Sequence, residues 1–168
     1  VFAVIGSHKK ENNPSVADNQ NNKTTAEPTT EEETTTKVPT VEVDLMMIGD
    51  MLMHEGVVKS GLMDDGTYNF DHLYTSIAKD ISSADIKIVN QETILGGSDF
   101  AYTGYPTFNS PWALGDAEVK AGFNIILHAT NHTLDKGLKG VENCLSFWKT
   151  YHPDTTVLGI NETEEDYE

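Results

Sequence analysis

Short apolar runs alternate with amphipathic stretches from residue 41 onwards. The runs cover residues 41–49, 86–90, 124–128 and 155–159, and glycine or polar residues lie at the end of each run or shortly after it. The first run alternates and then becomes continuously apolar, which is typical of a strand in a sheet that is buried on both faces. Strand–helix–strand units with crossovers of this length predict an α/β fold with a parallel sheet and right-handed connections.

The amphipathic stretches between these runs predict three helices. The first covers residues 71–81, with Asp71 as its N-cap. The second begins after Ser110, which a proline follows, and ends at Gly122. The third covers residues 137–151 and has a clear apolar face. Four side chains make up that face: Leu138, Val141, Leu145 and Trp148.

Residues 1–40 differ in composition from the rest. Val1–Gly6 is apolar but far shorter than the roughly 20 residues that cross a bilayer, so it reads as the end of a signal or anchor helix or as an ordinary terminus. Residues 7–40 are rich in Asn, Thr, Glu, Lys and Pro. A segment of this composition cannot bury enough apolar surface to compensate for the conformational entropy that it would lose on folding. We therefore expect a disordered stalk over residues 1–40, with an anchor or signal remnant at its start, and a folded domain over residues 41–168.

The charge of the chain argues against binding to nucleic acid, and its cysteine content argues against an internal disulfide. The formal net charge is −16 and the sequence contains no arginine, which excludes nucleic acid as a primary partner because phosphates are neutralised by clustered basic residues. The acidic balance suits divalent cations. The single cysteine, Cys144, rules out a disulfide within the chain, and its place in a helical apolar stripe predicts a core position.

Polar side chains follow three of the predicted strands. Asp50 and His54 follow the first, Glu92 the second, and Asn131 and His132 the third. Because the carboxyl ends of parallel strands meet at one edge of a sheet, we expect these side chains in one crevice. The candidate metal ligands are Asp50, His54, Glu92 and His132, and the candidate catalytic residues are Glu92, Asn131 and His132.

Two further residues are predicted to support this crevice. Asn90 would tie down the loop backbone. Asp135 would either hold an imidazole N–H group, as metal-binding histidines usually need, or cap the following helix. His128 ends an apolar run and is expected to be a buried core histidine. Four aromatic residues near the long loop after the second strand would line a pocket or plug the loop: Tyr102, Tyr105, Phe108 and Trp112.

Four ordered motifs, taken together, resemble those of the CapA family, the poly-gamma-glutamate capsule biosynthesis proteins with a calcineurin-like metallophosphoesterase fold. The motifs are GDMLMH at residues 49–54, SAD leading to NQET at 83–93, GYPTFNSP at 104–111 and HATNHTLDKG at 128–137. The resemblance covers residues 41–160.

The resemblance implies an extracytoplasmic bacterial protein, secreted or membrane-anchored, with a metal-dependent hydrolase site. It also implies a four-layer α/β sandwich, of which this chain would supply the parallel-sheet half. Many members of the family carry arginine where His54 stands and leucine where Gln91 stands. Members continue with His-x-Gly-x-Glu-like and Gly-His-x-His-like segments that this sequence lacks, so we expect the N-terminal part of a longer protein. The site positions that match the family are Asp50, His54, Glu92, Asn131 and His132.

Two functions remain open at this point. In the first, a divalent metal ion such as Mn²⁺, Mg²⁺ or Zn²⁺ activates water for attack on a phosphoester or amide-like bond. In the second, the domain is a non-catalytic accessory for assembly or export of the capsule polymer. The expected partners are an anionic capsule polymer or a phosphoester substrate, together with membrane-embedded capsule synthase subunits.

Overall fold

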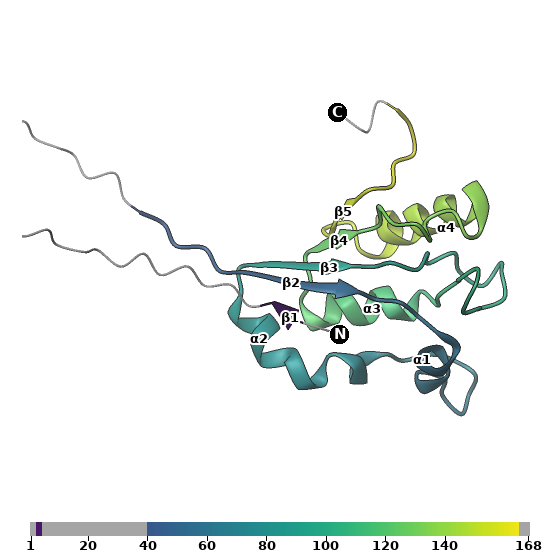
Figure 1. Ribbon diagram of the computed structural model, residues 1–168, viewed down its shortest axis with the longest axis horizontal. Coiled ribbons are helices and arrows are strands. Elements are labelled where there is room, and N and C mark those ends of the chain that lie inside the picture. The colour runs from purple at the N-terminus through teal and green to yellow at the C-terminus, as the bar shows by residue number, and fades with distance from the viewer. Residues whose placement is uncertain (1–2, 5–39, 165–168) are drawn as a thin grey trace, which may run out of the picture. The chain divides into compact units, whose positions relative to one another are not determined.

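The computed structural model describes residues 3–4 and 40–164 and contains an α/β domain (Figure 1). The strands are β1 (Ala3–Val4), β2 (Leu45–Asp50), β3 (Ile86–Asn90), β4 (Ile125–Leu127) and β5 (Thr156–Leu158). The helices are α1 (Glu55–Ser60), α2 (Ala78–Ser83), α3 (Ala113–Ala121) and α4 (Gly137–Tyr151), with 3₁₀ turns η1 (Asp71–Leu73) and η2 (Thr75–Ile77). None of the helices in the described residues is long and apolar enough to cross a membrane.

The strands form one sheet in the order β1-β2-β3-β4-β5. The four strands from β2 to β5 are parallel, which confirms the predicted parallel sheet. β1 pairs antiparallel with β2, at Ala3 opposite Ile48 and Val4 opposite Met47. The folded domain is predicted to begin at residue 41, whereas the structure adds Ala3–Val4 to its sheet. The predicted stalk over residues 5–39 lies outside the described residues.

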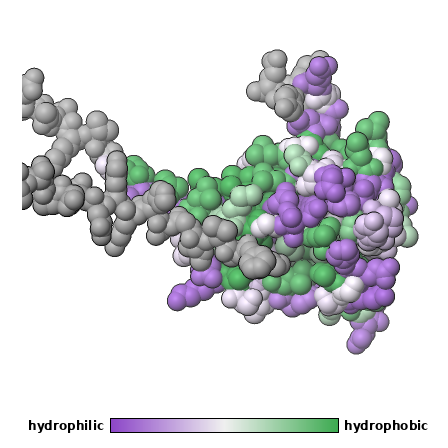
Figure 2. All heavy atoms as spheres, viewed as in Figure 1, coloured by the Kyte–Doolittle hydropathy of each residue, from purple (hydrophilic) through white to green (hydrophobic). Residues whose placement is uncertain are grey.

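Only one face of the sheet is covered by the described residues, contrary to the expectation of burial on both faces. Ile48, Val89 and Ile126 lie side by side on the covered face and are buried. Met47 and Leu158 lie on the other face and are 40 % and 49 % exposed. Because each parallel strand is the neighbour of the one before it, right-handed crossovers bring all the connecting helices to the same face. Hydrophobic residues accordingly reach the surface around the sheet (Figure 2).

The helices depart from the sequence predictions at their starts. Asp71 caps no long helix: residues 71–83 form two 3₁₀ turns and α2, and the Asp71 carboxylate pairs with Lys120 at 2.5 Å. Ser110 is likewise not an N-cap, since α3 begins at Ala113 and the Ser110 hydroxyl is buried. Gly122 ends α3 as predicted, in a left-handed conformation with φ of 109°.

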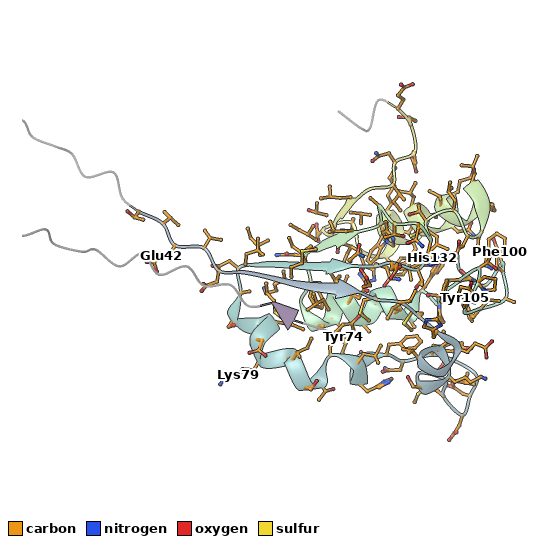
Figure 3. The ribbon with its side chains drawn as sticks, viewed as in Figure 1. Glu42, Tyr74, Lys79, Phe100, Tyr105 and His132 are labelled. Carbon is orange, nitrogen blue, oxygen red and sulfur yellow. The ribbon has the colours of Figure 1, made fainter. Side chains whose placement is uncertain are left out.

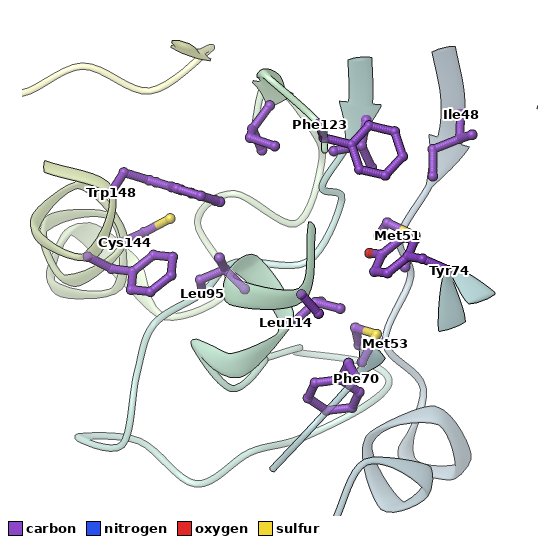
Figure 4. Close-up of a cluster of buried hydrophobic side chains, with 14 of the residues drawn as sticks. Ile48, Met51, Met53, Phe70, Tyr74, Leu95, Leu114, Phe123, Cys144 and Trp148 are labelled. Atoms are coloured by element: carbon purple, nitrogen blue, oxygen red, sulfur yellow. The ribbon is translucent and has the colours of Figure 1, made fainter. Parts of the chain in front are cut away.

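The third helix is predicted with its correct bounds. On its predicted apolar face, Leu145 and Trp148 are buried and Val141 is partly buried, whereas Leu138 is 75 % exposed. Gly140, Cys144 and Phe147, spaced by four and three residues, widen the buried face, as expected of a helical stripe. Cys144 is a core residue, as predicted. Part of this core is shown in Figure 4, with Cys144 and Trp148 of α4 at one side and Leu95 and Leu114 towards the middle.

Glu118 is an ionisable residue within this apolar core. It lies on α3, is fully buried, and neither of its carboxyl oxygens has a hydrogen-bond partner among the described residues. Burial raises the pKa of Glu118 well above its ordinary value of 4.5, and the nearby Tyr74 hydroxyl offsets part of that rise. The folded protein therefore holds Glu118 as the neutral acid.

Replacing Glu118 by glutamine is expected to flatten the dependence of stability on pH. The unfolded chain loses this proton near pH 4.5, whereas the folded protein keeps it, so the free energy of unfolding falls as the pH rises between the two pKa values. One proton gives a slope of up to about 1.4 kcal/mol per pH unit. Urea unfolding of both proteins from pH 5 to 8 measures the difference. The exposed variant Glu142→Gln is the control, and equal slopes in Glu118→Gln and wild type would contradict the prediction.

Candidate metal and catalytic site

The ends of β2, β3 and β4 are joined through their main chains. Asp50 is opposite Asn90 in the register of β2 and β3. Beyond that pair, the Met51 N–H group donates to the Asn90 carbonyl at 2.9 Å, and the Gln91 N–H group donates to Leu127 at 2.9 Å. These bonds bring the loops after the three strands to one edge of the sheet. His132 lies at the end towards which the β2 and β3 arrowheads point (Figure 3).

Asp50 and Asn90 form a direct side-chain pair. The Asn90 amide Nδ2 donates to Asp50 Oδ1 at 2.6 Å. Asn90 thus acts on the neighbouring carboxylate, rather than on loop backbone as the sequence analysis expected. One Asp50 oxygen is fixed by this bond, and Asp50 remains exposed. The pair presents an oriented carboxylate at the strand ends.

Glu92 lies among the other candidate residues. Burial raises the pKa of its carboxyl above 4.5, and the charge of Asp50 raises it further. His132 and His54 act in the opposite direction and lower the pKa of Glu92. Three of the predicted site residues are therefore close enough to Glu92 to act on its ionisation. A carboxyl with a raised pKa is suited to accept a proton nearer to neutral pH.

His132 is held by Asp135. The ring Nδ1 lies 2.7 Å from Asp135 Oδ2, and both side chains are largely buried. The same Asp135 oxygen accepts the Phe108 N–H group at 2.7 Å. The alternative role of Asp135 as helix cap is not seen, since no side chain caps α4. With Nδ1 donating to the carboxylate, the imidazole would present Nε2 with a free lone pair, which is the arrangement found in metal-binding histidines.

Phe108 separates the two candidate histidines. Its ring makes edge-on contacts with His132, at a centroid distance of 4.6 Å, and with His54, at 5.3 Å. Phe108 itself is 1 % exposed. Of the two roles considered for the loop aromatics, Phe108 is thus a hydrophobic plug, whereas Tyr105 is exposed. His54 and Asn131 are exposed as well, and among the described residues no hydrogen bond ties either side chain to another site residue.

Buried and partly buried hydroxyl groups support the loops, a role that was not predicted from the sequence. Thr130 Oγ1 donates to the Glu92 carbonyl at 2.7 Å and accepts the His132 N–H group at 3.1 Å. Thr93 Oγ1 and Ser110 Oγ are hydrogen-bonded at 2.7 Å, and both residues are fully buried. Thr93 and Thr130 each lie within three residues of a strand end, and this position in the sequence could have indicated their role. This network fixes the main chain on either side of Glu92.

A family model described as bacterial capsule synthesis protein PGA_cap matches residues 44–168. The chain belongs to this family. The match confirms the resemblance carried by the four motifs. No curated protein and no solved structure matches the chain.

Below the site, this capsule synthesis domain contains the buried histidine that the sequence predicted. His128 is 1 % exposed, and its Nε2 accepts a hydrogen bond from the Trp148 indole at 3.0 Å. Burial lowers the pKa of His128 to about 3, although a hydrogen bond with the Gln91 main chain acts in the opposite direction. His128 is therefore neutral at physiological pH. It links α4 to the loop that carries Glu92.

The candidate ligands of the capsule synthesis domain suit a divalent cation in their chemistry, but they do not enclose one. Carboxylate oxygens and an imidazole nitrogen are suitable donors. However, within residues 40–164 no group of three or more His, Cys, Asp and Glu side chains is close enough together to hold a metal ion. Among the described residues, the carboxylates of Asp50 and Glu92 and the imidazole of His132 are therefore neighbouring donors that do not form a three-ligand group.

Proposed function

We propose that this domain acts in capsule synthesis as a metal-dependent hydrolase of a phosphoester-type bond, outside the cell membrane. The observation that carries the proposal is the convergence on Glu92, which follows β3. Asp50 and His54 at the end of β2 and His132 after β4 all act on its pKa. An ionisable group whose pKa is shifted by burial and by several neighbouring charges is characteristic of catalytic sites. The description of the family as capsule synthesis proteins supports action outside the membrane, because a capsule is an outer layer of the cell.

In this proposal Glu92 is the general base and takes a proton from the attacking water. Its raised pKa makes it a better proton acceptor near neutral pH than an ordinary glutamate. Asp50 and His132 would hold the cation, and His54 would be a further candidate ligand. Asn90 and Asp135 fix the orientations of Asp50 and His132 through the bonds of 2.6 and 2.7 Å. The exposed Asn131 carboxamide is placed to donate to a phosphate oxygen.

A divalent cation bound at these residues lowers the pKa of a water molecule and offsets negative charge on the substrate. The need for such a cation follows from charge, since the chain carries a formal charge of −16 and an anionic polymer or phosphoester would otherwise be repelled. The sparse ligand set favours Mg²⁺ or Mn²⁺ over Zn²⁺. Mg²⁺ commonly keeps several waters and uses one or two carboxylates, whereas Zn²⁺ uses three or four protein ligands.

Replacing His132 by alanine is expected to weaken Mn²⁺ binding by at least about tenfold, because it removes the one buried imidazole donor of the site. The measurement is calorimetric titration of the purified 168-residue chain with Mn²⁺, followed by an assay with an aryl phosphate. The control is His152→Ala. His152 also contacts a carboxylate, with Nε2 at 2.7 Å from Asp116, but it lies at the far end of α4.

A loss of Mn²⁺ affinity in His132→Ala, with wild-type affinity in His152→Ala, supports the proposed site. Equal affinities in all three proteins would reject His132 as a ligand. Absence of Mn²⁺, Mg²⁺ and Zn²⁺ binding by the wild-type chain would reject a cation site formed by these residues.

A second function, as a non-catalytic accessory for assembly or export of an anionic polymer, is favoured by one observation. No three-ligand group is formed in residues 40–164. In this alternative the crevice binds polymer carboxylates through a bridging cation, with membrane-embedded synthase subunits as partners. Cation-dependent binding of poly-gamma-glutamate without hydrolysis of any phosphoester would favour the accessory role.

A further inference from the structure

An apolar cavity lies directly beside Asp50. It has a volume of about 180 Å³ and lies between the end of β2, α1 and the two 3₁₀ turns. We call it the Leu73 cavity. Asp50 is the one charged residue among the described residues that line it, and most of its wall is apolar. The wall includes Met51, Leu52, Val57, Leu73 and Ile77.

The cavity is not a closed packing void. Leu52, Val57, Leu73 and Ile77 are each partly exposed, so apolar side chains meet solvent at its opening. Deeper in the wall, Met51 and Tyr74 are almost fully buried and lie next to each other in Figure 4. Water in such a pocket lacks partners on the apolar wall, and an apolar group that replaced it would be stabilised.

The cavity and the candidate site share one residue, Asp50. Asp50 receives the Asn90 amide at the strand ends and also belongs to the cavity wall. A ligand whose charged head group lies at the strand ends would therefore have its neighbouring atoms beside the cavity. A polar or charged branch would lose hydration there without gaining a partner, whereas an alkyl chain would lose nothing.

We propose that the Leu73 cavity binds an alkyl chain of the substrate, attached to the phosphate head group that is held at the strand ends. The proposal rests on the proposed function for the head group only, because the cavity itself recognises the chain. The volume corresponds to roughly six water molecules, so the chain that fits has about five or six carbons. The substrate class is thus an alkyl phosphoester, not one with a charged side chain next to the phosphate.

The test is calorimetric titration of the full chain, in Mn²⁺, with methyl, butyl, hexyl and dodecyl phosphate. Affinity is expected to rise by about fourfold per methylene up to the hexyl compound and then to level off. In Leu73→Asn this gain is expected to disappear, while the affinity for methyl phosphate stays unchanged. Leu158→Asn, on the uncovered face of the sheet, is the matched control and is expected to behave as wild type. Melting curves confirm that each variant is folded.

Hexanol, which has no head group, separates this proposal from the proposed function. Hexanol binding that is present in wild type and lost in Leu73→Asn supports the cavity even where no phosphate binds, and in that case only the head-group site fails. Equal hexanol affinity in the two proteins overturns the chain subsite, whatever the result with Mn²⁺. Affinity that keeps rising to dodecyl phosphate also overturns it, because it indicates a lipid-like surface and not a cavity of limited length.

Discussion

Replacing Glu92 by glutamine is expected to lower the rate of phosphoester hydrolysis by roughly 10² to 10⁴, which is the usual contribution of a general base. Glutamine keeps the size and the neighbours of Glu92 but cannot accept a proton. The Thr130 hydroxyl bonds to the Glu92 main chain, so the loop should keep its position in the variant. The rate is measured at saturating Mn²⁺ with an aryl phosphate, and the affinity for Mn²⁺ is expected to change by less than about threefold if Glu92 is the base.

The pH profile provides the sharper readout for Glu92. Burial and Asp50 raise the pKa of Glu92 above 4.5, so the wild-type rate should increase with pH as Glu92 loses its proton. The Glu92→Gln variant should lack this increase. Glu162→Gln, which removes an exposed partner of Lys149, is the control and should keep it. An unchanged rate in Glu92→Gln would reject the base. A parallel loss of rate and Mn²⁺ affinity would make Glu92 a ligand instead.

The strands were the most predictable part of the fold, because their signal is local. The run IKIVN at residues 86–90 coincides with β3, and the predicted strands 124–128 and 155–159 contain β4 and β5. The predicted strand 41–49 overlaps β2, which starts later and ends one residue further on, at Asp50. What the runs could not reveal is coverage of the sheet. A continuous apolar run is equally consistent with a covered and an uncovered face, and the uncovered positions of Met47 and Leu158 depend on where the crossovers place the helices.

The starts of the helices were the least predictable part of the fold. Asp71 and Ser110 are both good N-cap residues, but each contacts a residue distant in sequence instead. Asp71 forms an ion pair with Lys120, and Ser110 forms a hydrogen bond with Thr93. A capping preference of about 1 kcal/mol is outweighed when tertiary contacts use the same side chain. Leu138 is exposed because the buried face of α4 is centred on Cys144 and includes Gly140 and Phe147, which leaves Leu138 towards solvent.

The residues that make up the site could be predicted from the sequence, but the contacts between them could not. The strand-end rule identifies Asp50, Glu92 and His132 from sequence because any parallel sheet collects such residues at one edge. The plug formed by Phe108 and the pairing of Asn90 with Asp50 depend on how loops fold over that edge. Buried Glu118 was missed for a different reason, because a glutamate in an amphipathic helix is usually exposed to solvent.

Replacing Gly159 by alanine is expected to destabilise the domain by about 2–4 kcal/mol, from a left-handed conformation and from overpacking together. Gly159 has φ of 95° and follows β5, where the His128 N–H group donates to the Leu158 carbonyl at 2.7 Å. A Cβ atom at Gly159 would overlap the Ala129 backbone and lie 2.8 Å from its Cα. The contact cannot be relieved by a side-chain rotation, because the obstacle is main chain.

Gly137 provides the matched control for this prediction. It also has a positive φ, 60°, but a Cβ atom there would meet nothing within 4 Å. Gly137→Ala should therefore carry only the conformational cost of about 1–2 kcal/mol. Urea unfolding at constant m-value measures both variants. A larger loss in Gly159→Ala than in Gly137→Ala indicates that β5 packs directly against the loop leading to His132, whereas equal losses would contradict that close approach.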